Sequence, residues 1–368
     1  MLTDWKVKMK KLLKASLALL TGVSLAACSS GSASGTTEPT TPEGTAAAEQ
    51  EKPLRVALVT NLKGNSAFID DGIAGFEETA KSYGWDYSIA ECGADEDYET
   101  NARAFAQEDY DLILGLSWQA TAAIKAVATE FPDAASYALV DDNSGLDNVM
   151  DVTFTEASGA YLIGRMAALV TNGESHNYGA VHAMEGQSGW VGWRYPFMQG
   201  VLSVDPDARF EFRYVGSYSD PEKANELAKQ LAALGCKFIN AACAGGDYGV
   251  FDAAEELGFY TSGQDEDLTD YGDNVISCQL KDTYNAVKYV LDKFSEGNWD
   301  PADVNLGIKE DTIGAVWVTK DSKLSTRADV LTDDIIADLK ATAEDLKAGK
   351  IDLTAPDSST YEYPKIND

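Results

Sequence analysis

Short apolar runs alternate with helical patterns along most of this chain, and this alternation limits its fold more than any other feature. Three runs of apolar and β-branched residues, Leu54 to Thr60, Asp111 to Leu116 and Tyr137 to Val140, read as buried strands. Helical segments separate them, and Gly84 and Pro132 end two of these helices. Such alternation predicts a parallel, doubly wound sheet. The other elements expected here are helices over 71–83, 99–107 and 121–131 and a strand over 87–90.

The same alternation restarts at Tyr178 and predicts a second α/β lobe. Its expected strands cover 178–182, 210–215 and 238–242, and its helices cover 195–204, 221–234 and 250–257. Three segments are expected to cross between the lobes: 149–154 with the helix 157–170, 275–280 with the helix 283–294, and 308–318. Three crossings make a hinge, and the cleft between such lobes collects a ligand at the carboxyl ends of the strands.

The N-terminus has the layout of an export signal. Five lysines between Lys6 and Lys14 precede the apolar run Ala15 to Leu20, and small residues follow as far as Leu25-Ala26-Ala27-Cys28. The apolar run is too short to span a bilayer. A cysteine directly after Leu-Ala-Ala resembles a bacterial lipobox, which implies cleavage before Cys28, acylation of its sulfur and anchoring to the outer face of a membrane. The alternative is an ordinary secreted protein with a chance cysteine.

The chain is expected to divide into a signal peptide, a tether and two lobes. Residues 1–27 are expected to form the signal peptide, and residues 28–52, which contain no aromatic residue, a flexible tether. The folded part begins near Pro53 and is long enough for two domains of about 150 residues. We expect the first lobe over 53–155 and about 281–315, and the second over about 172–275 and about 318–368. In the C-terminal tail, Tyr361 and Tyr363 could pack on a lobe.

Composition excludes some partners and chemistries. The chain has 60 acidic and 29 basic residues, a net charge of −31, so nucleic acid and anionic lipid surfaces would repel it. Besides Cys28 it has four cysteines and no CxxC pair, which argues against a zinc or redox motif. We expect these to be buried free thiols: Cys92, Cys236, Cys243 and Cys278.

No catalytic motif stands out. The chain has two histidines and lacks GxSxG, GxxxxGK[ST] and HExxH. In Gly186-Gln187-Ser188-Gly189, Trp190 occupies the place where a nucleophile elbow needs its second glycine. Asp265-Glu266-Asp267 begins like a calcium loop, but Asp270 stands at the sixth position, where the turn needs glycine. We therefore expect a binding protein rather than an enzyme, with no metal and no cofactor.

Seven short segments carry a family resemblance by their order and spacing from Leu54 to about Ala315. They are Ala67-Phe68 with 74–76, Asp97-Tyr98-Glu99 with Asn101, 110–115, 130–133, 152–154, 214–217, and Ala244-Gly245-Gly246 with 249–251. Together they resemble the basic membrane protein family of extracytoplasmic binding lipoproteins, which includes the bacterial purine nucleoside receptors. The resemblance implies a type I periplasmic-binding-protein-like fold, in which two Rossmann-like lobes are joined by a three-crossing hinge.

That family holds the base of a nucleoside between two aromatic rings. By resemblance, Phe68 matches one ring and Trp193 the facing one, although either could be core and Phe197 competes with Trp193. Stacking on each face contributes about 1–3 kcal/mol, by analogy with nucleic-acid bases. Asn61 and Asp141 each follow a predicted strand and match positions that read the base edge. Their structural alternatives are a turn for Asn61 and a helix cap for Asp141.

The resemblance also assigns contacts to the ribose. Asp265 and Lys281 match an acid and a lysine that hold ribose hydroxyls, and the alternative is a hinge salt bridge without a ligand role. Gly245, with Gly246, would let the backbone approach the ligand at a βα turn, although tight turns also use glycine.

The chain departs from the family pattern in three places that bear on which base is bound: the loop Leu62 to Ser66 is shortened, and two residues differ. Ile69 stands where the family has Asn, and Ala122 where it commonly has Asp. We expect a monomeric, lipid-anchored protein on the extracytoplasmic face of the cell membrane, which captures a purine nucleoside for the permease and ATPase subunits of an ABC importer. Two alternatives stay open: a receptor for another small ligand such as a sugar, and a nucleoside hydrolase.

Overall fold

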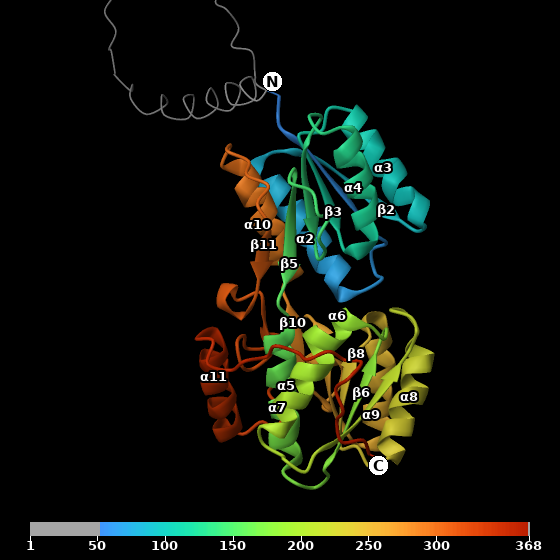
Figure 1. Ribbon diagram of the computed structural model, residues 1–368, viewed down its shortest axis with the longest axis vertical. Helices are drawn as coiled ribbons and strands as arrows, with labels where there is room; N and C mark the ends of the chain where they lie inside the picture. Colours follow the sequence, from blue (N-terminus) through green and yellow to red (C-terminus); the bar gives the residue numbers. More distant parts are fainter. Residues whose placement is uncertain (1–51, 367–368) are drawn as a thin grey trace, which may run out of the picture.

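The computed structural model describes residues 52–366, which form two α/β lobes stacked along the long axis of the molecule (Figure 1). Each lobe contains one six-stranded sheet, with the order β11-β5-β4-β3-β1-β2 in the first and β12-β10-β9-β8-β6-β7 in the second. The predicted pair of doubly wound lobes is confirmed. The expected signal peptide, Cys28 and the tether as far as residue 51 lie outside the described residues.

The first lobe has helices on both faces of its sheet. The strands are β1 (Arg55–Asn61), β2 (Asp86–Cys92), β3 (Leu112–Leu116), β4 (Ser136–Val140), β5 (Val149–Phe154) and β11 (Val304–Leu306). Helices α2 (Ala67–Tyr83) and α10 (Thr283–Ser295) cover one face, and α3 (Asp95–Gln107) and α4 (Thr121–Glu130) cover the other. All five residues of β3 are buried, which explains why the strand reads as a continuous apolar run.

The second lobe repeats this plan. Its strands are β6 (Asn177–His182), β7 (Arg209–Tyr214), β8 (Phe238–Ala242), β9 (Tyr260–Asp265), β10 (Val275–Lys281) and β12 (Ile313–Ala315). Helices α5 (Ala157–Thr171), α7 (Tyr195–Leu202) and α11 (Asp333–Lys347) cover one face, and α8 (Pro221–Ala233) and α9 (Asp247–Leu257) the other. A short turn, α6 (Gln187–Gly189), and a π-helical turn, η2 (Trp190–Arg194), lead into α7.

The chain crosses between the lobes three times, as predicted. The crossings follow β5, β10 and β11. Backbone hydrogen bonds join the crossing segments, from Thr155 N–H to the Leu306 carbonyl (2.8 Å) and from Asp282 N–H to the Thr312 carbonyl (2.8 Å). Helix α5 packs on α7 of the second lobe. The second lobe therefore begins before the boundary expected near 172. Similarly, β12 pairs with β10 in the second sheet. The last segment of the first lobe therefore ends before the boundary expected near 315.

Helix α2 begins earlier than the sequence pattern predicted, and this places Phe68 in its first turn. Ser66 is the N-cap, and its hydroxyl accepts a hydrogen bond from Ile69 N–H (3.4 Å). The helix ends at Gly84, whose positive φ of 68° suits glycine, as predicted.

The four cysteines of the described region, Cys92, Cys236, Cys243 and Cys278, are buried free thiols, as expected. No helix within residues 52–366 has both the length and the apolar character that a membrane span requires.

Candidate functional site

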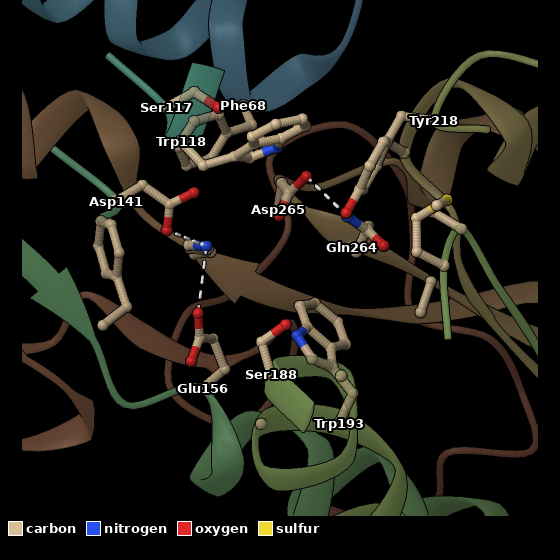
Figure 2. A pocket seen from close by; sticks show the side chains of 18 of the residues that line it. Phe68, Ser117, Trp118, Asp141, Glu156, Ser188, Trp193, Tyr218, Gln264 and Asp265 are labelled. Atoms are coloured by element: carbon tan, nitrogen blue, oxygen red, sulfur yellow. Dashed lines mark hydrogen bonds and ion pairs between the residues drawn. The ribbon is translucent and has the colours of Figure 1, made fainter. Parts of the chain in front are cut away.

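A cavity of about 680 Å³ lies between the two lobes (Figure 2). Its walls come from the carboxyl ends of the strands, where α/β folds bind their ligands. Residues at or just after the strand ends line it from both sheets: Asn61, Ser117, Asp141 and Thr155 from the first, and His182, Ala242, Asp265 and Lys281 from the second. The cavity therefore lies where the alternation of strands and helices predicted an interlobe ligand.

Six of the seven predicted ligand residues line this cavity. They are Asn61, Phe68, Asp141, Trp193, Asp265 and Lys281. Phe197, the competitor of Trp193, is only 1% exposed and belongs to the core of the second lobe. Phe68 lines the cavity and also packs in the core of the first lobe.

Gly245 lies elsewhere. It belongs to the turn that leads into α9 and borders a separate crevice of about 10 Å³. A Cβ at this position would lie 3.2 Å from the backbone carbonyl oxygens of Asn65 and Tyr218. The glycine therefore allows the close approach of protein backbone from the first lobe, rather than of a ligand in the large cavity.

Lys281, at the end of β10, is the centre of the polar cluster. Its ammonium lies 2.5 Å from Asp141 Oδ1 and 3.2 Å from Glu156 Oε1. It also lies 5.0 Å from the ring centroid of Phe68 and 4.9 Å from that of Phe154, within cation–π range. Because Asp141 follows a strand of the first sheet and Lys281 ends a strand of the second, this ion pair joins the two lobes.

The salt bridge between Asp265 and Lys281, considered as the alternative to a ligand role, is not formed within residues 52–366. Among the described residues, the ion pairs of Lys281 go to Asp141 and Glu156, whereas Asp265 accepts a hydrogen bond from Gln264 Nε2 (2.9 Å). Asp265 and Lys281 end two neighbouring strands, β9 and β10, although the sequence pattern predicted a strand only for the segment before Lys281. It gave no indication that the first lobe supplies a closer acid.

The cluster holds more carboxylates than cations. Burial raises the pKa of Asp141 to about 6, although Lys281 opposes the rise. Burial also raises the pKa of Asp265, again against the effect of Lys281. Burial disfavours the charge of Lys281, but Asp141, Glu156 and Asp265 outweigh it and hold the pKa of the ammonium above its ordinary value. Lys281 is therefore charged at neutral pH, and three carboxyl groups surround its single ammonium.

Three lining residues have a backbone conformation that non-glycine residues rarely adopt. The φ angles are 78° at Ser117, 80° at Asp141 and 71° at Asp265. Each residue follows or ends a strand at the cavity. Such strain concentrates at functional sites, so these angles mark the strand ends around the cavity as a candidate site.

Aromatic side chains reach the cavity from both lobes. In Figure 2, Phe68 and Trp118 of the first lobe lie on the side opposite Trp193 of the second, and Tyr218 lies nearer to Gln264. Trp118 is 54% exposed and Tyr218 42%, although both are large and partly apolar. Exposed aromatic rings at a cavity are available for a ligand to cover.

His182 gives the second-lobe wall a neutral polar group. Its side chain is buried at the end of β6. Burial, and next the charge of Arg194, lower the pKa of His182 to about 3, so the imidazole is neutral at pH 7. In the described part of the chain, neither its Nε2 nor Nη1 of Arg194 has a hydrogen-bond partner.

Sequence reasoning missed Trp118, Glu156, His182 and Tyr218. Each lies at the end of a predicted strand or within a few residues of it. The strand-end rule used for Asn61 and Asp141 would therefore have included them, but the family resemblance directed attention to other positions.

In the segment considered as a calcium loop, Asp267 makes local hydrogen bonds. Asp267 Oδ1 accepts hydrogen bonds from Thr269 N–H (3.2 Å) and from the Thr269 hydroxyl (2.6 Å). Within residues 52–366, no group of three or more His, Cys, Asp or Glu side chains is arranged to hold a metal ion.

Comparison with known proteins places this cavity in a functional context. The family model Bmp, described as "ABC transporter substrate-binding protein PnrA-like", matches residues 58–350. The chain is 25% identical over 331 residues to the "CD4+ T-cell-stimulating antigen" of Listeria monocytogenes, covering 82% of this chain and 88% of that protein. It is 24% identical over 358 residues to the "ABC transporter nucleoside-binding protein BmpA" of Lactococcus lactis subsp. cremoris, covering 88% and 97%.

A solved structure shares the fold. The ABC transporter system solute-binding protein of Aeropyrum pernix K1 superposes with a TM-score of 0.71 at 21% identity, covering 83% of this chain and 94% of that one. The predicted type I periplasmic-binding-protein fold is thereby confirmed. The family match also confirms the predicted family and the prediction of a transporter binding protein rather than an enzyme. The chain belongs to the PnrA-like family of ABC transporter substrate-binding proteins.

Proposed function

We propose that this substrate-binding protein captures a purine nucleoside in the interlobe cavity while anchored outside the membrane through an acylated Cys28. The observation that carries the proposal is the composition of the cavity, in which aromatic rings from both lobes surround a buried group of acids and one lysine. The 24% identical relative named as nucleoside-binding supports the same ligand class.

The aromatic residues suit the base. Phe68 and Trp193 approach from different lobes, so a flat heterocycle between them would gain about 1–3 kcal/mol from each stacked face. Asn61 and Asp141 would read the base edge. Because Asp141 is already bound to Lys281, a ligand must share this acid with the ammonium.

The charged residues suit a neutral sugar. Asp265 offers an acceptor and Lys281 a donor at the ends of adjacent strands, as vicinal hydroxyl groups require. The surplus of carboxylates around Lys281 would repel a phosphate group. Nucleosides should therefore bind, and the corresponding nucleotides should be excluded.

Ligand contacts to both lobes would stabilise a closed arrangement about the hinge. Closure would cover the exposed rings of Trp118 and Tyr218 on the two sides of the cavity. The closed form would then deliver its ligand to the permease and ATPase subunits of the importer.

A thermal-shift panel tests the ligand. The probes are adenosine, guanosine, inosine, a pyrimidine nucleoside, free bases, ribose and a nucleoside monophosphate, added to the fragment that starts near Glu51. A ligand bound only by the folded state raises stability by RT ln(1 + [L]/Kd). We expect shifts with purine nucleosides and none with ribose or the monophosphate. Shifts with sugars alone would instead identify a sugar receptor.

Two substitutions test the site. Trp193→Leu should raise the nucleoside Kd by about 5- to 150-fold through the loss of about 1–3 kcal/mol of stacking. Asp265→Asn keeps a residue that tolerates the φ of 71° and should also weaken binding. Trp299→Leu, at a partly buried ring that packs against the core of the first lobe, is the matched control. Unchanged affinity in both site variants would refute the proposal.

A further inference from the structure

The C-terminal tail packs on the second lobe behind one wall of the cavity. Residues 348–366 follow α11 and run across this lobe in Figure 1, where they are dark red. The tail ends beside β7, the edge strand of the second sheet, where Phe210 N–H donates to the Pro364 carbonyl (2.8 Å). The family match stops at residue 350, so nearly all of this tail lies beyond the matched region.

The middle of the tail contacts one short stretch of the lobe, which we call the wall segment, residues 186–194. Trp190 Nε1–H donates to the Pro356 carbonyl (2.7 Å), and the Ser358 hydroxyl donates to Gln187 Oε1 (3.1 Å). The ring of Tyr361 lies 5.5 Å from the ring of Trp190, centroid to centroid. These contacts leave Trp190 only 3% exposed.

The wall segment forms much of the second-lobe side of the cavity. Six of its residues line the cavity: Gly186, Ser188, Gly189, Val191, Gly192 and Trp193. Three of the six are glycines, whose backbone loses the most freedom on ordering, and the segment contains a π-helical turn. Within the segment, Arg194 Nη2 donates to the Gly186 carbonyl (2.9 Å) and holds its two ends together. Such a segment needs contacts from outside to keep one conformation.

We propose that the tail is a strap that positions the wall segment, and through it Trp193, for the ligand. Trp190 and Tyr361 act as positioning residues, because Tyr361 packs on Trp190 of the wall segment and neither ring is among the residues that line the cavity. Only the choice of ligand in the test rests on the proposed function. The packing of the strap on the wall segment is independent of it.

Amide hydrogen exchange and ligand affinity, both measured on the full mature chain, test the strap. Tyr361→Ala removes the ring, and Tyr361→Phe keeps it. The control, Tyr83→Ala, removes a partly exposed ring that stacks on Trp85 in the first lobe. We expect faster exchange confined to residues 186–194 in Tyr361→Ala and a purine nucleoside Kd raised by about 3- to 10-fold. Tyr361→Phe and Tyr83→Ala should behave like the wild type in both measurements.

Two results would overturn the strap. One is unchanged exchange at residues 186–194 in Tyr361→Ala. The other is faster exchange across the whole second lobe with an unchanged Kd, which would mean that the ring only adds stability. Trp190→Phe, which keeps the ring and loses the N–H donated to Pro356, gives a second test if Tyr361→Ala folds poorly. If no nucleoside binds the wild type, the proposed function fails, whereas exchange in the wall segment still decides on the strap.

Discussion

Lys281 is the single residue on which the charge balance of the cavity depends. It is 8% exposed and is bound to Asp141 and Glu156. Removing one partner of a buried ion pair costs about 3–5 kcal/mol, because the remaining charges lose their compensation. Lys281→Met should therefore lower the free energy of unfolding by about 3 kcal/mol, measured by urea denaturation without ligand. Adding Asp141→Asn should restore part of the loss.

The control for this prediction is an exposed ion pair. Lys288→Met breaks the contact of Lys288 with Asp292 one turn along α10 and should change the free energy of unfolding by no more than about 0.5 kcal/mol. If Lys281→Met is equally mild, the carboxylates around it are not held charged by the lysine.

The same residues mark the limit of sequence reasoning at this scale. Asn61 and Asp141 could be placed at the cavity because each follows a predicted strand, and Asp265 and Lys281 could be placed there by the family resemblance. The partner of Lys281 could not be predicted, because Asp141 lies on the other lobe and the pairing depends on how the lobes meet. Gly245 was misplaced for a similar reason, since its neighbour Asn65 also belongs to the other lobe.

At the scale of elements, α7 packs directly against the backbone of α5 at Gly200. A Cβ at Gly200 would overlap the Tyr161 carbonyl of α5 and lie 2.8 Å from Arg165 N. Both obstacles are backbone, so the helices must move apart. Gly200→Ala should lower the free energy of unfolding by about 1–3 kcal/mol in urea denaturation. Gly272→Ala adds the same methyl group in open space and should change it by less than about 0.5 kcal/mol. Equal effects would contradict tight packing.

Elements with a regular apolar period could be predicted, and irregular ones could not. Buried strands such as β3 and long helices such as α8 carry a clear pattern. Strand β12 has only three residues, too few to show a period. The predicted boundary near 315 therefore assigned this strand to the first lobe, although it pairs in the sheet of the second. The π-helical turn at Trp190–Arg194 has no sequence signature at all, because its backbone depends on the tail and the cavity around it.

For the whole molecule, the two lobes meet through acids as well as through the hinge. Asp71 lies on α2 of the first lobe, and Glu266 directly follows β9 of the second. Burial, and next the charge of Asp282, raise the pKa of Asp71 to about 6. Burial, and next the charge of Asp71, raise the pKa of Glu266 to about 7. With both groups ionised, the lobes repel each other across the cleft.

These shifts predict that the protein is more stable in mild acid than at pH 8. An acid whose pKa is higher in the folded state than its ordinary value near 4 binds its proton first in that state. The free energy of unfolding therefore rises as pH falls through about 7 toward 4. Asp247, with a pKa raised by burial to about 7, acts in the same direction. His182 opposes them, because the unfolded chain protonates its imidazole near pH 6.5 and the folded state does not.

Several acids stabilise the folded state on acidification, and one histidine, His182, acts against them. The melting temperature of the ligand-free protein should therefore rise by several degrees as the pH is lowered from 8 to 5. Each kcal/mol corresponds to roughly 2–4 °C for domains of 150–250 residues. Glu266→Gln removes one of the shifted acids, so at pH 8 the variant should already have part of the stability that the wild type gains on acidification. Its rise in melting temperature should be correspondingly smaller. A melting temperature that falls steadily from pH 8 to pH 5 would mean that His182 outweighs the acids of the cleft.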